Sequence, residues 1–193
     1  MTGKSSGEGE ARISDRARLD MVFQDHYPEI KRRIRQMLRR ESHLTIQATE
    51  VLHEVYLNLA RDPNLSYDEM RAVLSLIAVR TREYLVDRAR RRNARKRGGD
   101  VLFVSLTAAE NIGQEKPIDV LLLNEALSRL AAESPLAAEI AHLRWFVGLT
   151  EKEIAPLVGK GRSKVQRSWE FTKVWLADFL SSRSHSTEES HGE

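Results

Sequence analysis

The sequence predicts an all-α protein made of two small helical domains joined by a linker. Its 193 residues include only ten Gly and five Pro, and the helix-favouring residues Leu, Ala, Arg and Glu are abundant. Apolar residues recur at three- and four-residue steps along most of the chain, which is the spacing of one buried helix face. Residues 104–117 lack this periodicity and contain Asn111, Gly113 and Pro117. We therefore interpret them as the linker.

The first predicted helix covers residues 14–40 and follows a leader, residues 1–13, that has no apolar signal core. We expect the leader to be disordered because it is poor in apolar residues. Pro28 should break or kink the helix, since proline removes a backbone donor. The apolar positions are Leu19, Val22, Phe23, Ile30, Ile34, Met37 and Leu38. The second half is decorated by the basic residues Lys31, Arg32, Arg33, Arg35, Arg39 and Arg40.

The second predicted helix covers residues 47–60, with Thr45 as the candidate for its cap. The predicted buried stripe consists of Val51, Leu52, Val55, Tyr56 and Leu59. The polar residues left outside this stripe are Glu50, His53, Glu54 and Asn58. A turn is predicted at Asp62-Pro63-Asn64, and the next helix should begin near Tyr67.

That third helix is strongly basic. Residues 80–99 hold eight Arg and one Lys against Glu83 and Asp87, which leaves seven net positive charges, whereas the whole chain carries +3. An apolar stripe runs along the same helix through Leu74, Ile77, Thr81, Leu85 and Ala89. One side should therefore face a core and the other a polyanion such as a phosphate backbone. The alternative is a solvated basic face without a partner.

Beyond the linker the pattern predicts four helices, over residues 119–130, 135–146, 150–159 and 162–180, with a short ordered turn near residues 101–106. Ser134 and Pro135 have the residue types of an N-cap and first helical position. Thr150 and Glu153 form a capping-box pattern, and Gly159 ends the third of these helices. Residues 182–193 are rich in Ser, His and Glu and are predicted to be a disordered tail.

The last two helices have the pattern of a helix-turn-helix, with a Gly-containing turn before a helix whose first turns are basic. In such a motif the start of the second helix faces base edges in the major groove. Any helical hairpin with a surface lysine can mimic the pattern. The buried positions should be Val165, Trp169, Thr172, Leu176 and Phe179. The candidate DNA contacts are Arg162, Ser163, Lys164, Gln166 and Arg167.

Composition argues against several other classes of protein. There is no cysteine, which excludes disulfides, thiolate metal sites and a cysteine nucleophile and fits a reducing, cytoplasmic compartment. No apolar run approaches the ~20 residues of a membrane span. His53 and Glu54 are not accompanied by a ligand or acid–base cluster. We therefore expect no enzyme activity, metal or cofactor, and we expect Trp145, Phe146 and Trp169 to be core residues.

Four blocks of the sequence resemble bacterial extracytoplasmic-function (ECF) sigma factors of the sigma-70 family. The first is LTIQATEVLHEVYL at residues 44–57, and the second is LVDRARRR at residues 85–92, followed by Ala94 and Lys96 to Gly99. The third is residues 119–130. The fourth is LRWFVGLT at residues 143–150 together with Gly159 and VQRSW at residues 165–169. Their order and spacing match the family from about residue 19 to residue 180.

The resemblance implies a protein that binds core RNA polymerase and directs transcription initiation at promoter DNA. Region two, residues 14–103, would bind polymerase and the minus-ten element, and region four, residues 118–181, the minus-thirty-five element. Its implied location is the cytoplasm, associated with the nucleoid when bound to polymerase; an anti-sigma factor or other regulator is a candidate partner. The implied polymerase contacts are Glu50, His53, Glu54 and Asn58. The candidate DNA contacts of region two are Arg80, Arg88, Arg91, Arg92 and Arg95.

The sequence departs from the family at several positions. Pro156 lies within the predicted third helix of region four, which it should kink or shorten. Gly161 replaces a common capping Ser, which should weaken that cap. The aromatics often found near residues 72–74 are missing, which leaves Tyr67 and Tyr84 as stacking candidates. Two other functions remain open: a polymerase-independent helix-turn-helix regulator, and an enzyme acting on nucleic acid, for which no catalytic constellation is visible.

Overall fold

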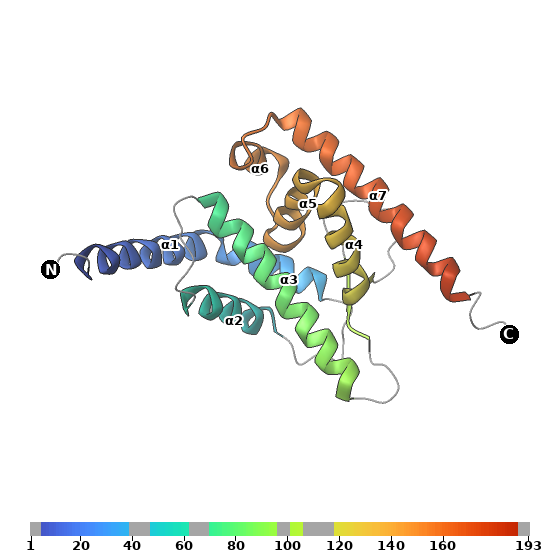
Figure 1. Cartoon of the computed structure of the whole chain (residues 1–193), viewed down its shortest axis with the longest axis horizontal. Coiled ribbons are helices and arrows are strands. Elements are labelled where there is room, and N and C mark those ends of the chain that lie inside the picture. The colour runs from blue at the N-terminus through green and yellow to red at the C-terminus, as the bar shows by residue number, and fades with distance from the viewer. Residues whose placement is uncertain (1–4, 39–46, 62–69, 96–100, 106–117, 189–193) are drawn as a thin grey trace.

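The computed structural model describes residues 5–38, 47–61, 70–95, 101–105 and 118–188, and these residues confirm the all-α fold (Figure 1). The helices are α1 (Ser5–Met37), α2 (Ala48–Arg61), α3 (Met70–Arg95), α4 (Val120–Glu133), α5 (Pro135–His142), α6 (Glu151–Leu157) and α7 (Arg162–Glu188), with a π-helical turn, η1 (Leu143–Val147). Two short strands, β1 (Phe103–Val104) and β2 (Ile118–Asp119), pair antiparallel. The predicted cap at Thr45 and the turn at residues 62–64 lie outside the described residues.

Helix α1 is longer and less interrupted than the sequence suggested. It begins at Ser5, so residues 5–13, expected to be a disordered leader, are helical, and it continues through Pro28. The predicted break is wrong because Pro28 is exposed, where only one backbone hydrogen bond is lost, while Ile30 and Ile34 just beyond it are completely buried. Once a helix is anchored by packing, adding residues at its end costs little.

Helices α1, α2 and α3 pack together as the first half of the fold. The predicted stripe of α2 is buried at Val51, Leu52, Val55 and Leu59. Tyr56 is only partly buried, because its hydroxyl reaches the surface of α1. There it donates to Asp20 Oδ1 at 2.6 Å and accepts from Arg16 at 2.6 Å.

The start of the predicted linker is packed rather than free. Val104 and Ser105, which the sequence assigned to the linker and a short turn, are buried. The Ser105 amide donates to the Met37 carbonyl at 2.8 Å, and the Val120 amide donates to the Leu102 carbonyl at 2.9 Å. The pairing of β1 with β2 therefore holds the two ends of residues 106–117 side by side; that segment itself lies outside the described residues.

The second half of the fold begins with two differently capped helices. Asp119 caps α4 by accepting from the Leu121 amide at 2.8 Å. Pro135 occupies the first turn of α5 as expected, but the Ser134 side chain makes no capping hydrogen bond. The predicted helix over residues 135–146 is α-helical only to His142, and it continues as the π-helical turn η1 up to Gly148.

Helices α6 and α7 form the predicted helix-turn-helix. The Thr150 hydroxyl accepts from the Glu153 amide while the Glu153 carboxylate accepts from the Thr150 amide, which confirms the capping box. Gly159 follows α6 with φ +62°, and the hydrogen bonds Lys160 N to Ala155 O and Gly159 N to Pro156 O close a Schellman motif. Pro156 lies in the last turn of this short helix.

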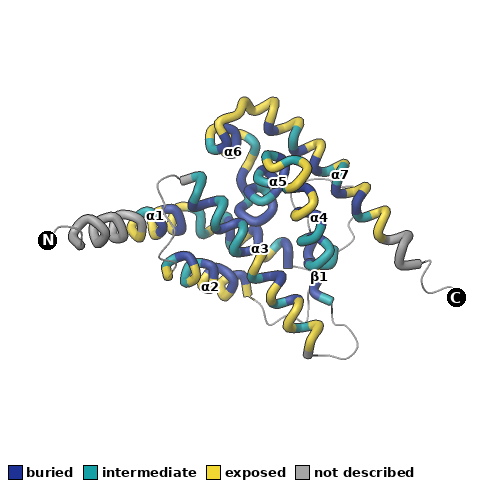
Figure 2. Tube along the Cα trace, viewed as in Figure 1, coloured by how far each residue is buried: buried dark blue, intermediate teal, exposed yellow. Residues whose placement is uncertain are grey.

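The two halves pack against each other around one continuous apolar core. Helices α1 and α3 both contact η1, and α3 also contacts α4 and α5. Figure 2 shows buried segments of these elements converging at the centre of the molecule, while the far end of α3 is exposed. The linker therefore connects two units that are docked in this structure. Helix α7 continues to Glu188, so residues 182–188 of the predicted disordered tail are helical.

We predict that Thr150→Ala destabilises the fold by about 1 kcal/mol, the usual effect of losing an N-cap hydroxyl. The Thr150 hydroxyl is also the main reason that the pKa of Glu153 is lowered. A lowered carboxyl pKa stabilises above the ordinary pKa and stops doing so as the pH falls through the folded value. The difference in unfolding free energy between wild type and Thr150→Ala should therefore shrink in acid. Thr150→Ser keeps the hydroxyl and should behave as wild type in the same urea titrations.

Candidate polymerase and nucleic-acid surfaces

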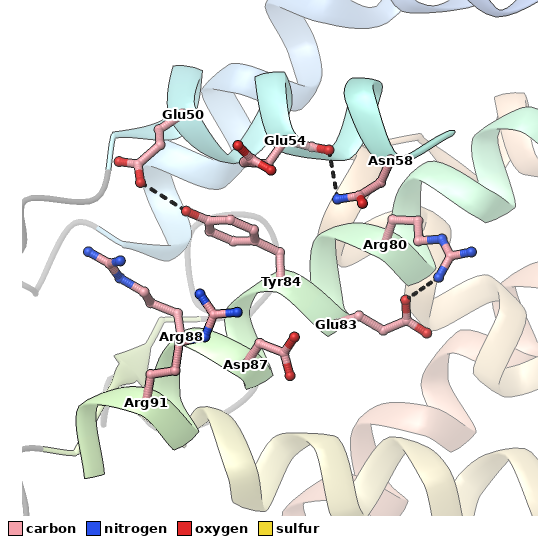
Figure 3. A pocket seen from close by; sticks show the side chains of 9 residues that line it. All are labelled: Glu50, Glu54, Asn58, Arg80, Glu83, Tyr84, Asp87, Arg88 and Arg91. Carbon is pink, nitrogen blue, oxygen red and sulfur yellow. Dashed lines mark hydrogen bonds and ion pairs between the residues drawn. The ribbon is translucent and has the colours of Figure 1, made fainter. Parts of the chain in front are cut away.

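A polar pocket of about 500 Å³ lies between α2 and α3 (Figure 3). Its walls bring together residues that the sequence assigned to two different partners. From α2 come three of the predicted polymerase contacts, and from α3 come three of the predicted DNA contacts. The lining residues are Glu50, Glu54, Asn58, Arg80, Glu83, Tyr84, Asp87, Arg88 and Arg91.

The α2 wall follows from helical spacing. Glu50, Glu54 and Asn58 are four residues apart and therefore lie along one face, and the Asn58 amide donates to the Glu54 carbonyl at 2.9 Å. His53 is exposed but is not part of the pocket lining. The four predicted polymerase contacts are all exposed, but they form two faces of α2 rather than one.

The α3 wall shows which arginines are already engaged. Arg80 Nη1 lies 2.9 Å from Glu83 Oε2, the intramolecular pairing that the sequence suggested. Arg82 was expected to pair with Glu83 as well, but its Nη1 lies 3.2 Å from His142 Nε2 on α5. The pocket holds four carboxylates and three guanidinium groups, so it carries one net negative charge. It is therefore better suited to a mixed polar partner than to a phosphate.

Tyr84 links the two walls of the pocket. Its hydroxyl donates to Glu50 Oε1 at 3.0 Å (Figure 3), and burial, with a further contribution from Glu50, raises the pKa of Tyr84 to about 12. The phenol is thus protonated at neutral pH and is engaged with α2. Tyr67, the other stacking candidate, lies outside the described residues.

The positive charge of α3 is concentrated beyond the pocket, toward its C-terminal end. Arg90 and Arg91 are exposed and Arg92 is half-buried. Arg95 is the last residue of α3, and its side chain lies outside the described part. This end of the helix is exposed in Figure 2 and presents closely spaced guanidinium groups, which suit successive phosphates of a nucleic-acid strand.

The start of α7 is the second candidate surface. All five predicted DNA contacts, Arg162, Ser163, Lys164, Gln166 and Arg167, are exposed. The opposite face is anchored, with Val165 fully buried and Trp169 2% exposed. Trp169 packs edge-on against Trp145 at 5.2 Å between ring centroids. These tryptophans and Phe146 are core residues, as predicted. A Cβ added at Gly161 would meet nothing within 4 Å.

The two surfaces are far apart on the molecule. In Figure 1 the first turn of α7 lies at the top, next to α6, and the C-terminal end of α3 lies at the bottom. Among the described residues there is no cluster of metal-ligating side chains, and none of the described helices is long and apolar enough to cross a membrane.

Sequence reasoning missed one group of residues, those between the two halves of the fold. Arg33 was placed among surface arginines, yet it is 3% exposed, and its Nε donates to the Trp145 carbonyl at 3.1 Å. A signal was present, because Arg33 lies three residues after Ile30 and four before Met37, within the apolar stripe of α1. Arg71 and Glu139 form a second contact across this boundary, at 2.7 Å, and no local pattern indicated it.

We predict that Tyr84→Phe lowers the free energy of unfolding at neutral pH by about 1 kcal/mol, the typical net value of one hydrogen bond. The raised pKa of Tyr84 means that this contribution is complete below pH ~10 and disappears as the pH rises through about 12. In a phenolate absorbance titration the variant should lack the transition near pH 12. Tyr27→Phe is the matched control, since it keeps the ring that contacts Lys31. Equal stability of Tyr84→Phe and wild type would contradict the role given to the Glu50 contact.

Comparison with known proteins agrees with these surfaces. A family model described as ECF sigma factor matches residues 10–182. Searches of curated proteins and of solved structures found no match. The family match covers most of the 193 residues and includes both the α2–α3 pocket and the helix-turn-helix. The chain therefore belongs to the ECF sigma factor family, whose members are non-enzymatic transcription factors that act with RNA polymerase in transcription initiation.

Proposed function

We propose that this sigma factor docks on core RNA polymerase through α2, holds the minus-ten region of the promoter with α3 and reads the minus-thirty-five element with α7. The observation that carries the proposal is the start of α7. It exposes Arg162, Lys164 and Arg167 to solvent while Val165 and Trp169 fix the opposite face in the core. This is the arrangement that a recognition helix requires in order to enter a major groove.

Polymerase binding is assigned to the α2 wall of the pocket and to His53. Glu50, Glu54 and Asn58 are exposed, and their backbone is held rigidly by the buried stripe of α2. Carboxylates at fixed spacing on a rigid helix provide a docking surface for a basic partner surface.

The basic end of α3 is assigned to the opened minus-ten region. Exposed guanidinium groups at Arg90 and Arg91, joined by Arg92, track a phosphate backbone without reading sequence. Arg80 and Arg88 line the pocket, and Arg80 is already paired with Glu83. We therefore assign the phosphate contacts to Arg91, Arg92 and Arg95 in the first place, and place Arg80 and Arg88 behind them.

The run-off transcript tests the proposal as a whole. Core polymerase supplemented with this protein should give a specific transcript that core polymerase alone does not give. A polymerase-independent regulator would bind DNA with the same helix-turn-helix but would neither co-purify with core polymerase nor support a transcript. That result would reject the proposal in favour of the regulator.

We predict that the double charge reversal Glu50→Lys/Glu54→Lys reduces binding to core polymerase at least tenfold in a pull-down without DNA, since like charges across an interface cost several kcal/mol. The matched control is Glu170→Lys/Asp178→Lys, which makes the same change in charge at exposed positions of α7. Circular dichroism should show both variants folded. Wild-type binding by a folded Glu50→Lys/Glu54→Lys protein would remove α2 from the polymerase interface.

For α7 we predict that Arg167→Ala and Lys164→Ala have different effects on sequence preference. Arginine can bond a guanine edge in a bidentate manner, so Arg167→Ala should cost ~1–3 kcal/mol at the preferred upstream element and relax the choice of base there. Lys164→Ala should weaken binding to all sequences by similar factors, as loss of a phosphate contact does. Selection from a promoter library randomised at the upstream element measures both. An unchanged consensus with Arg167→Ala would make Arg167 a phosphate contact as well.

A further inference from the structure

Three polar contacts join the two halves of the fold, and we refer to them together as the latch. The first is the hydrogen bond from Arg33 to the carbonyl of Trp145. The second is the bidentate pair of Arg71 with Glu139, 2.7 Å at both nitrogens. The third is Arg82 Nη1 with His142 Nε2 at 3.2 Å; because arginine can only donate, the imidazole nitrogen accepts. The partners are 60 to 112 residues apart in the sequence.

The latch buries charge with little compensation. Arg33 is 3% exposed and faces a carbonyl rather than a carboxylate. Burial, with repulsion from Arg144 and Arg32, lowers the pKa of Arg33 to about 10. Burial and the neighbouring Arg82 lower the pKa of His142 to about 4, so the imidazole is neutral. Arg82 Nε and Trp145 Nε1 are buried without a hydrogen-bond partner in the described structure. Such unpaired buried donors each cost about 1–3 kcal/mol, so the docked arrangement is weaker than its size implies.

The docked arrangement is too compact to span a promoter. Elements centred near minus ten and minus thirty-five are separated by roughly 25 base pairs, or about 85 Å of duplex at 3.4 Å per step. Two domains of about 90 and 64 residues have radii of gyration of roughly 12 and 11 Å, which places their centres roughly 30 Å apart when they touch. A gap of about 55 Å must therefore open between them before both elements can be bound together.

The strand pair β1–β2 sets how far the halves can separate. The twelve residues 106–117 span at most roughly 40–43 Å when fully extended. That length is shorter than the gap, and β1 and β2 hold its ends together in this structure. The whole segment from Val101 to Asp119, nineteen residues, reaches roughly 63–68 Å. Binding both elements therefore requires both the latch and the β1–β2 pair to come apart.

We propose that this structure is the closed resting form of the protein, in which the latch and the β1–β2 pair hold region four on region two and prevent simultaneous binding of the two promoter elements. The proposal rests on the function proposed above. Each binding surface remains exposed in the closed form, so polymerase docking through α2 and contact of either element alone are not blocked. What the closed form withholds is the gain in affinity from binding both elements with one chain. Opening is thus a condition for a full promoter complex.

The first test measures the distance between the two halves directly. The chain has no cysteine, so Gln24→Cys on α1 and Asp178→Cys on α7, both at exposed positions, can carry two spin labels without background. Free protein should give one narrow, short distance distribution. A promoter complex with core polymerase should move it outward by roughly 50 Å, the gap derived above. A broad or long distribution in the free protein, or an unchanged short distance in an active promoter complex, would overturn the closed form.

The second test releases the latch. Glu139→Arg places two like charges at the Arg71 contact and should populate the long distance in free protein. It should also lower the sigma concentration needed for half-maximal run-off transcription about fivefold or more, the usual range of coupling between two conformations. The swap Arg71→Glu/Glu139→Arg should restore both wild-type values. Glu170→Arg is the matched control, since it makes the same change in charge on an exposed face of α7.

Two further outcomes keep the proposals separate. If Glu139→Arg fails to fold, Arg71→Gln weakens the same contact from the half-exposed α3 side and should give the same direction of change. If either folded variant opens the molecule without changing transcription, the latch has no regulatory role and the inference is wrong. Absence of any transcript from wild-type protein with a short label distance would instead reject the proposed function.

Discussion

Helix α3 is the element on which the rest of the structure depends, because different sides of it are buried by different parts of the chain. Helix α2 covers one side, while η1, α4 and α5 cover another. Leu74, Ile77 and Leu85 are at most 1% exposed as a result. The fully buried Thr81 hydroxyl bonds the Ile77 carbonyl within the helix, so this seam contains no unpaired polar group from Thr81. Only a narrow strip of α3 remains for solvent, and its C-terminal arginines occupy that strip.

This packing divides the basic stretch into groups with different roles. Arg82 is turned toward His142 at the boundary between the halves. Arg80 and Arg88 line the pocket beside carboxylates, and Arg91 lies where the pocket meets the exposed end of the helix. A count of arginines therefore overstates the charge available to a phosphate backbone. The number that matters is set by which helix face each guanidinium occupies, and only the full set of neighbouring helices fixes that face.

The boundary between the halves combines good apolar packing with poor polar pairing. Met37, Leu85, Val104 and Phe146 meet there in a nearly void-free junction, and this contact holds the halves together. Buried arginines without carboxylate partners oppose it, because removing a charge from water is costly unless the charge is paired. An interface balanced in this way can be stable in the isolated chain and still separate when a larger partner provides competing contacts.

The sequence by itself determined the features that depend on nearby residues. Apolar spacing indicated the buried stripe of α2, and residue types at fixed offsets gave the capping box at Thr150 and the Gly159 turn, because their hydrogen bonds join residues at most five positions apart. Only the tertiary structure decided the burial of Arg33, the continuity of α1 through Pro28 and the pairing of β1 with β2. An apolar stripe shows that a helix face is buried but not which element covers it. Contacts between residues many tens of positions apart leave no local pattern, since any complementary surface could satisfy them.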